Sequence, residues 1–504
     1  MTVKGPRDTR LPVGFTVRLG RRTRVLDGGA ALLGGPGRLL HLAPAARRLL
    51  PAGVDTLVVA DPKGAARARH LLDAGLADPV PDRLPEAATP AAVTVVIPVR
   101  DRPAELRRLL AALATTAPGL HAVLVVDDGS RDAARCREIA GAAGASVLRH
   151  EHSRGPAAAR NTGLAAVRSG FVAFLDSDVV PEPGWLTPLL AHLTDPAVAA
   201  VAPRIIGLSG PVGAGPGGWL TRYEGLRSSL DLGPDAAPVL PRSRVAYVPS
   251  AALLVRRDAV GGAIGGGFDE AMRVAEDVDL GLRLHAAGWR IRYEPAARVA
   301  HEHRVDPRAW WTRKAFYGTG AAPLAVAHPG SVPPAVLAPW TAAVTALVLV
   351  QRPRALLAAA GVTVLATVRL RRTLFRLRHP TREAARLAAR GLLAAAAQAA
   401  GLLTRHWWPL AALACGCSRR ARRATLIAAL VEGGYDWLTH RPTPGEPGLD
   451  PVRYLIAHRL DDLGYGTGLW LGALRRRTPA PLIPLVPGLR RAEVPRRVRS
   501  SRRA

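Results

Sequence analysis

Two aspartates one residue apart, Asp176 and Asp178, directly follow the apolar run FVAFL at residues 171–175. The run predicts a buried β-strand, so both carboxylates should emerge where that strand ends. Two like charges this close repel each other unless a cation lies beside them. Carboxylates so placed can hold Mg²⁺ or Mn²⁺, with substrate phosphates completing the ion's shell. The alternative is an acidic turn that simply faces water.

Two earlier acidic turns also follow apolar runs. In VLVVDDGS, Asp127 and Asp128 end a predicted strand, and their carboxylates could accept hydrogen bonds from a nucleoside. A capped turn is the alternative interpretation. In VVIPVRDRP, Pro98 and Asp101 follow another strand, and Asp101 could instead cap the next helix.

The second half of the chain supplies a candidate base and a third candidate metal ligand. AEDVDLGLRLHAAG places Glu276 and Asp277 at the start of a predicted helix, where the dipole favours negative charge. Capping explains one acid, so we predict that Asp277 is a general base for an acceptor hydroxyl. His301 ends the strand in ARVAHEHR and is predicted to bind metal, although a lone histidine is more often packed or solvated. Arg160, in GPAAARNTG, could neutralise a diphosphate or lie on a solvated helix face.

Regularly alternating elements must position these residues. Apolar strands are predicted at 93–97, 122–126, 146–150 and 171–175, and helices at 103–114, 131–144 and 155–168. Helices between short apolar strands predict right-handed crossovers and a parallel sheet. Ligands of such sheets bind at the carboxyl ends of the strands. All the acidic turns fall at such ends, so the sequence predicts one cleft.

Three domains are predicted. Residues 1–88 form a small α+β domain, with strands in FTVRLGRRTRVLD and AALLGG and helices in RLLHLAPAARRLL and AARARHLLDAGLADPV. Residues 89–320 form the α/β domain described above. Residues 321–504 form a basic helical region. Three cysteines are too few for a disulfide framework, and the start of the chain lacks an apolar signal segment, so we expect a reducing cytosol.

The last region is predicted to associate with a membrane. The formal charge is +30, and from Gln351 onward there are 28 arginines against 8 acids. The apolar run 334–351 could just span a bilayer, whereas 355–368 reaches only about 21 Å against a core of about 30 Å. Interfacial helices, with Trp407 and Trp408 at headgroup level, are expected beside it. An alanine-rich soluble helical domain is the alternative.

Seven segments in order resemble the family 2 glycosyltransferases of the GT-A fold: VTVVIPVRDR, VLVVDDGS, GPAAARNTGL, FLDSD, GGFDE, AEDVDLGLRL and PAARVAH. The resemblance implies a Rossmann-like, mostly parallel sheet and inverting transfer from a nucleoside-diphosphate sugar, usually a UDP-sugar. It implies nucleotide-sugar contacts for six residues: Pro98, Asp101, Asp127, Asp128, Arg160 and Asp176. It implies a Mg²⁺ or Mn²⁺ site at Asp176 and Asp178, with Asp277 as base and Glu276 orienting the acceptor; His301, from its place after the acidic helix, is our third candidate metal ligand.

The whole architecture is similar to the branch of this family that acts in mycofactocin biosynthesis. That resemblance implies glucose transfer from UDP-glucose onto a peptide-derived redox cofactor precursor, at the cytoplasmic face of the cell membrane. The first domain resembles small winged-helix carriers that bind precursor peptides. A cell-envelope lipid or polysaccharide acceptor is the alternative. We rank nucleic-acid binding last, because the arginine-rich end lacks interleaved aromatic residues.

The sequence departs from processive members of the family. These carry Q-x-x-R-W after the base helix, where this chain has AWWTRKAFYGTG. Trp310 and Trp311 could form an aromatic platform for a growing glucan, but the mismatch weighs against a cellulose-like synthase.

Overall fold

The computed structural model describes residues 5–34, 38–43, 55–85, 88–208, 218–263, 266–303, 306–441 and 448–488. The chain forms two compact units. The first comprises Met1–Trp310 with His440–Asp450, and the second comprises Trp311–Thr439 with Pro451–Ala504. The domain limits after residues 88 and 320 stay predictions.

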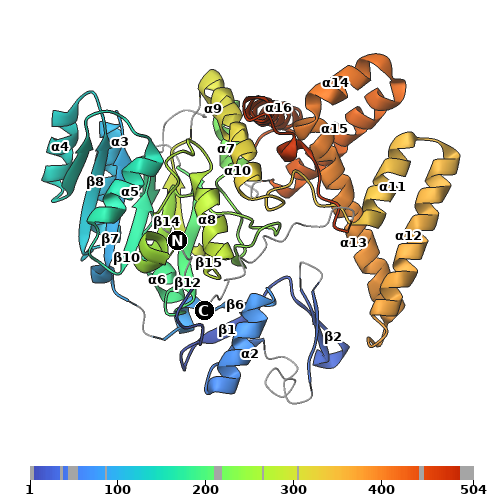
Figure 1. Cartoon of the computed structure of the whole chain (residues 1–504), viewed down its shortest axis with the longest axis horizontal. Helices are drawn as coiled ribbons and strands as arrows, with labels where there is room; N and C mark the ends of the chain where they lie inside the picture. Colours follow the sequence, from blue (N-terminus) through green and yellow to red (C-terminus); the bar gives the residue numbers. More distant parts are fainter. Residues whose placement is uncertain are drawn as a thin grey trace, which may run out of the picture. The chain divides into compact units, whose positions relative to one another are not determined.

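A nine-stranded sheet dominates the first unit, and its first half follows the sequence pattern closely (Figure 1). The strands are β7 (Val93–Val99), β8 (Ala122–Asp128), β9 (Ser146–His150) and β10 (Phe171–Leu175), connected through α3 (Pro103–Thr116), α4 (Ala133–Ala142) and α5 (Pro156–Ala166). They pair in parallel in the order β10-β7-β8-β9. The predicted parallel strands with helical connections are therefore confirmed, while the right hand of the crossovers stays a prediction.

The second half of the sheet is mixed, so the expectation of a mostly parallel sheet is wrong. It consists of β11 (Val179–Pro181), β12 (Val198–Gly207), β13 (Ala237–Pro238), β14 (Ala252–Arg256) and β15 (Arg290–His301). β14 runs antiparallel to both β10 and β12, whereas β12 and β15 are parallel. Helices α6 (Leu186–His192) and α7 (Trp219–Arg227) still separate some of these strands, but β10 leads to β11 and β13 leads to β14 without a helix, so the regular series of crossovers that imposes a parallel direction ends at β10.

Alternate residues of β7 explain how the sheet is buried on both faces. Val95 and Ile97 pack in one apolar layer with Leu106 and Leu109 of α3. Val96 faces the opposite layer, which includes residues of α5 and of α8 (Glu276–Ala286). A strand with apolar residues at successive positions is what a sheet covered on both sides requires.

The first residues of the unit form two small sheets, with strand orders β5-β1-β6 and β2-β3-β4. Their strands are β1 (Thr16–Leu19), β2 (Arg24–Leu26), β3 (Ala31–Leu33), β4 (Leu39–His41), β5 (Thr56–Val58) and β6 (Ala77–Pro79), with α2 at Pro62–Asp73. The helix predicted over 38–50 is wrong in its described part, because β4 pairs with β3 there. The rest of that prediction, 44–50, lies outside the described residues.

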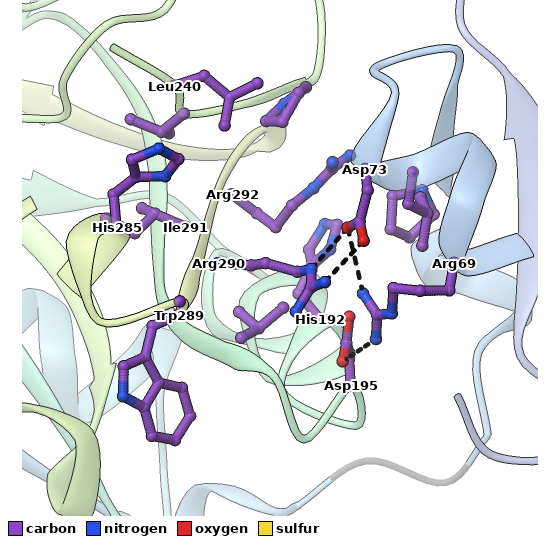
Figure 2. A pocket seen from close by; sticks show the side chains of 16 residues that line it. Arg69, Asp73, His192, Asp195, Leu240, His285, Trp289, Arg290, Ile291 and Arg292 are labelled. Carbon is purple, nitrogen blue, oxygen red and sulfur yellow. Dashed lines mark hydrogen bonds and ion pairs between the residues drawn. The ribbon is translucent and has the colours of Figure 1, made fainter. Parts of the chain in front are cut away.

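Ion pairs join α2 to β15 and to the turn before β12, around a cavity of about 200 Å³ (Figure 2). Arg290 pairs with Asp73 at 2.6 Å, and Arg69 pairs with Asp195 at 2.6 Å. The cavity lies at the start of β15, about 36 Å of extended strand from His301 at its end. Because its charged side chains neutralise one another far from the acidic turns, we interpret it as a seam within the unit.

The second unit is helical, as predicted. Its helices include α10 (Ala321–Ala327), α11 (Pro339–Val350), α12 (Pro353–Thr373), α13 (Pro380–Gly401), α14 (Trp408–Cys417), α15 (Arg419–Thr439) and α16 (Pro451–Arg475). Two helical segments, Pro353–Thr373 and Pro380–His406, are long and apolar enough to cross a membrane by length and composition.

These lengths correct two expectations about spans. The run 334–351 forms only α11, about 18 Å long, because its prolines confine the helix to Pro339–Val350. The run 355–368 belongs to α12, whose arginine-bearing ends extend it to about 32 Å. The headgroup position expected for Trp407 is not supported, because its ring nitrogen donates to the Leu482 carbonyl at 2.8 Å inside the unit.

Candidate active site

The turn that carries Asp176 and Asp178 is held between two strand pairs. The amide of Asp176 donates to the Ala251 carbonyl (2.9 Å), and the amide of Val179 donates to the Asp176 carbonyl (3.2 Å). β11 begins at Val179 and pairs there with His301 of β15. This register brings His301 Nε2 to 3.6 Å from Asp178 Oδ1. Residues far apart in the sequence therefore meet, as the predicted metal site requires.

Arg160 connects this turn to the helix that carries the candidate base. Its buried guanidinium donates to Asp176 Oδ1 at 2.6 Å and to Glu276 Oε1 at 2.8 Å. Burial disfavours the charged form, but the carboxylates of Asp176 and Glu276 outweigh it and raise the pKa of Arg160. The alternative of a solvated helix face is therefore wrong.

Asp277 lies in the first turn of α8. Its Oδ2 accepts from the Ser250 amide at 3.1 Å, and its Oδ1 accepts from the Val278 amide at 2.8 Å. Burial, reinforced by the neighbouring charge of Glu276, raises the pKa of Asp277 to about 6. A carboxylate with that pKa is a better proton acceptor near neutral pH than an ordinary aspartate.

Asp128 is engaged by the chain itself. Its Oδ1 accepts from the Arg154 amide (2.8 Å) and contacts His150 Nδ1 (2.8 Å), while its Oδ2 accepts from Ser153 Oγ (2.7 Å) and the Gly155 amide (2.9 Å). Burial opposes ionisation, but these hydrogen bonds lower the pKa of Asp128. The carboxylate therefore fixes the loop that leads into α5.

Asp127 and Asp101 also hold turns at this edge. Asp127 Oδ1 accepts from the Ser130 amide at 2.8 Å, and its other oxygen pairs with Arg149. The Asp101 amide donates to Ser130 Oγ at 3.0 Å, and Asp101 Oδ1 accepts from the Arg131 amide at 2.8 Å. Asp101 thus bridges to the next turn, and the cap predicted for its own helix is not what its carboxylate forms.

The predicted site residues in the turns after β7, β8 and β10, at 98–101, 127–128 and 176–178, lie at one edge of the sheet, which we call the acidic edge. The strand order β10-β7-β8 puts the turns after these strands side by side, with Pro98 opposite Val126 in β7 and β8. The structure thus brings the acidic turns together, while the role of each residue stays a prediction. Trp310, suggested for a glucan platform together with Trp311, is buried and donates to Glu224 at 2.8 Å, so the suggestion is wrong for Trp310.

Sequence reasoning missed two cations of this edge, Arg149, which pairs with Asp127, and Arg102. Arg102, in the same RDRP segment as Asp101, forms an ion pair with Asp178. Its place directly after the strand carried the signal, because a cation there faces the neighbouring strand end.

Asp178 and His301 fit a divalent cation. His301 Nδ1 is buried and has no hydrogen-bond partner among the described residues, and the other ring nitrogen faces Asp178. Carboxylate oxygen suits Mg²⁺ and Mn²⁺, and a neutral imidazole nitrogen is a common metal ligand in proteins. A tighter group of ligand-type side chains, Glu432, His458 and Asp462, lies in the second unit. There Arg459 already pairs with Glu432 and Asp462, so an arginine supplies the positive charge.

Sequence similarity to known proteins identifies the family of this chain. The sequence matches the family described as Glycosyl transferase family 2 over residues 94–239, and Glycosyl transferase family group 2 over 171–412. It is 50% identical over 483 residues to the pre-mycofactocin glycosyltransferase of two Mycobacterium tuberculosis strains, covering 95% of this chain and 99% of that protein. The chain belongs to glycosyltransferase family 2. It is therefore a glycosyltransferase, and the alignment includes nearly all of both units.

Solved structures of glycosyltransferases are more distant. The mannosyltransferase PcManGT from Pyrobaculum calidifontis, in complex with GDP-Man and Mn²⁺, is 22% identical with a TM-score of 0.36, covering 62% of this chain and 89% of that chain. TarS 1-349 of S. aureus with UDP-GlcNAc is 20% identical with a TM-score of 0.34, covering 45% and 66%.

Proposed function

We propose that this glycosyltransferase transfers glucose from UDP-glucose, with inversion, onto pre-mycofactocin, a peptide-derived redox cofactor precursor, and extends the product to an oligoglucoside. The supporting observation is the 50% identity over 99% of the pre-mycofactocin glycosyltransferase. A match of that length includes the small N-terminal sheets and the helical unit as well as the acidic edge.

Inversion requires an acceptor hydroxyl to attack the anomeric carbon on the face opposite the departing diphosphate. Asp277 is proposed as the base that takes the hydroxyl proton, since its raised pKa suits that step. Glu276, adjacent to it on α8, is proposed to orient the acceptor. Arg160 holds both Glu276 and Asp176, which keeps the acceptor side and the donor side in fixed relation.

The donor is proposed to bind across the ends of β10, β7 and β8. Asp178 and His301, with Asp176, would hold Mg²⁺ or Mn²⁺, which when bound stabilises negative charge on the leaving diphosphate. Asp127, Asp101 and Pro98 are proposed to lie at the nucleotide. For Asp128 we propose a loop-holding role, because its four hydrogen bonds from the chain leave it little capacity for a ligand.

Association with the cytoplasmic face of the cell membrane is also proposed. The most apolar stretch of α12 is only 11% buried, so its leucines and valines face outward. Arg352 and Arg354 lie near its start, and Arg371 and Arg372 near its end. Each arginine close to an anionic leaflet contributes on the order of 1 kcal/mol. Outward apolar residues between cationic ends therefore suit a lipid surface.

The test is direct glucosylation. The full-length protein in detergent, UDP-[¹³C]glucose, Mn²⁺ and pre-mycofactocin should yield products heavier by one or more labelled hexoses in mass spectrometry. The Asp277→Asn variant should yield none, and UDP-galactose should be a poorer donor. Transfer that is absent with the cofactor precursor but present with membrane lipid extract would contradict the proposal.

A lipid or polysaccharide acceptor is the second candidate, favoured by the exposed apolar helices of the second unit. Cells lacking the gene distinguish the two. Loss of hexose-bearing cofactor species with normal envelope glycans supports the first candidate, and the reverse supports the second.

A further inference from the structure

Asn161 is the only asparagine among the 504 residues. It follows Arg160 on α5, so the two side chains start from adjacent positions at the acidic edge. An asparagine amide offers one acceptor oxygen and two donor hydrogens at its tip, which neither a carboxylate nor a hydroxyl can match. A single asparagine here suggests a task that needs donor and acceptor together.

The amide of Asn161 pairs with one backbone unit of the loop before α8. Its Oδ1 accepts from the Phe268 amide at 2.8 Å, and its Nδ2 donates to the Phe268 carbonyl at 2.9 Å. The second Nδ2 hydrogen reaches Glu270 Oε1 at 3.0 Å. Both donors and the acceptor are thus used, as in the pairing of two residues in an antiparallel sheet.

The rest of the loop is adapted to this pairing. Gly267 has φ +74°, and a Cβ there would lie 2.3 Å from Asn161 Oδ1, so only glycine permits the close approach. Phe268 is buried with its ring edge-on to Phe174, the centroids 5.2 Å apart. The Arg160 guanidinium lies 5.4 Å from the same ring. The loop is therefore held both by the packing of the Phe268 ring and by the hydrogen bonds of its backbone to Asn161.

The loop is also joined to the base helix. Arg283 of α8 donates to the Gly267 carbonyl at 2.7 Å and pairs with Asp279 at 2.7 Å. The loop ends at Ala275, whose φ of +67° is unfavourable for a residue with a side chain, and Glu276 and Asp277 follow. A strained backbone conformation at the start of a helix persists only when the structure on either side holds it in place.

We propose that Asn161 is a positioning residue for the transfer step, acting through residues 266–270 to set the place of Asp277. Arg160 fixes Asp176 and Glu276 from one turn of α5, while Asn161 fixes the loop that enters α8 from the same turn. Residues proposed to contact the donor and the acceptor are thus both positioned by α5. The inference deepens the proposed function, because it rests on Asp277 being the base.

The chemistry predicts how substitutions should differ. Asn161→Asp is isosteric but directs an oxygen at the Phe268 carbonyl and the Glu270 carboxylate, where donors are needed. Asn161→Ala leaves both backbone groups of Phe268 without their partner. Glu270→Gln in the Asn161→Asp background replaces carboxylate repulsion with an amide donor and should restore part of the activity.

The first measurement separates transfer from donor binding. For both Asn161 variants we expect glucose transfer to fall at least about tenfold, since a displacement near 1 Å at a reacting group can cost about a hundredfold. UDP affinity should change less than about twofold, and hydrolysis of UDP-glucose by water should fall less than transfer. Unchanged transfer, or equal losses of transfer and UDP affinity, would overturn the inference.

The matched control is Thr94→Val. Thr94 Oγ1 bonds to Ser169 Oγ at 2.7 Å in the buried start of β7, at the opposite end of the sheet. This variant loses a buried side-chain hydrogen bond without touching the loop. We expect it to lower the melting temperature while leaving the ratio of transfer to hydrolysis unchanged.

The second measurement needs no substrate, so it separates this inference from the proposed function. In hydrogen–deuterium exchange, Asn161→Ala should speed exchange at least about tenfold in peptides spanning 266–280, and Thr94→Val should not. If the native enzyme glucosylates nothing but this local deprotection is seen, the proposed function fails and the loop role stands. Exchange that stays unchanged, or rises equally throughout the first unit, would overturn the loop role.

Discussion

The pH dependence of transfer tests the base most directly. Burial and the charge of Glu276 raise the pKa of Asp277 from 3.8 to about 6. Because the base acts only when ionised, activity should fall as pH falls through 6. At pH 5, about one carboxyl in eleven is ionised, so kcat/KM should be about tenfold below its plateau. An aspartate with its ordinary pKa would lose less than about 10% there.

The fall in activity below pH 6 is the acid limb of the pH profile. Glu276→Gln shows whether this limb reports the ionisation of Asp277. The substitution removes a negative neighbour, so the pKa of Asp277 should fall and the limb should move to lower pH. The absolute rate should also fall, but the comparison uses only the position of the limb. A limb that stays near pH 6 in this variant, or a flat native profile from pH 7.5 to 5, would refute the assignment.

Stability provides an independent readout of the same shift. Because the folded-state pKa is raised, ionised Asp277 destabilises the native protein above pH 6, and protonation relieves this as pH falls. The difference between a pKa of 3.8 in the unfolded chain and about 6 in the native protein corresponds to at most about 3 kcal/mol. Asp277→Asn should therefore raise the melting temperature at pH 7.5, and the gain should vanish by pH 4. A gain that is constant with pH would contradict the raised pKa.

Four further outcomes are expected. His301→Ala should raise the Mn²⁺ concentration needed for half-maximal activity at least about tenfold, and EDTA should abolish activity of the native enzyme. Asp128→Asn should lower stability by about 3 kcal/mol, with little loss of UDP affinity, because an amide nitrogen cannot accept the two hydrogen bonds that reach one of the carboxylate oxygens. Replacing the exposed Leu357, Val364 and Leu365 of α12 by glutamine should release most of the protein from membrane vesicles.

Each of these outcomes has a contrary result. Activity that survives EDTA would remove the metal role. A large loss of UDP affinity in Asp128→Asn, without loss of stability, would indicate that Asp128 binds the nucleotide. The control for α12 replaces three equally exposed valines of the first unit with glutamine, namely Val13, Val25 and Val58. If both triple variants sediment with vesicles as the native protein does, α12 does not bind the membrane.

The alternating part of the fold could be predicted because its pattern is local. From Val93 to Leu175 each apolar strand and each helix matches an element of the structure within a few residues. The direction of β14 could not be predicted, because it depends on which open edges of β10 and β12 the returning chain finds. The length of α12 cannot be predicted from its uncharged residues alone, because arginines continue the helix at both ends.

The acidic turns were predictable for the same reason, but their partners were not. An acid after an apolar strand identifies the edge of a parallel sheet, so Asp127, Asp176 and Asp178 could be placed together. Which cation each one meets depends on residues distant in sequence. Arg149 on the next strand pairs with Asp127, and Arg160 is buried beneath Asp176. Thus the sequence indicated where the chemistry lies better than how its charges are balanced.

The balance of charge at the acidic edge explains how like charges are accommodated there. Four carboxylates and two arginines are linked by ion pairs or adjacency: Asp176, Asp178, Glu276 and Asp277 with Arg102 and Arg160. Full ionisation would leave two negative charges in excess, which is the charge that one divalent cation neutralises. Among the pairs described, Asp277 is the carboxylate that meets backbone amides instead of an arginine side chain. Burial and the charge of Glu276 together raise the pKa of Asp277. The excess of negative charge that adds to this effect is also the charge that the proposed cation would neutralise.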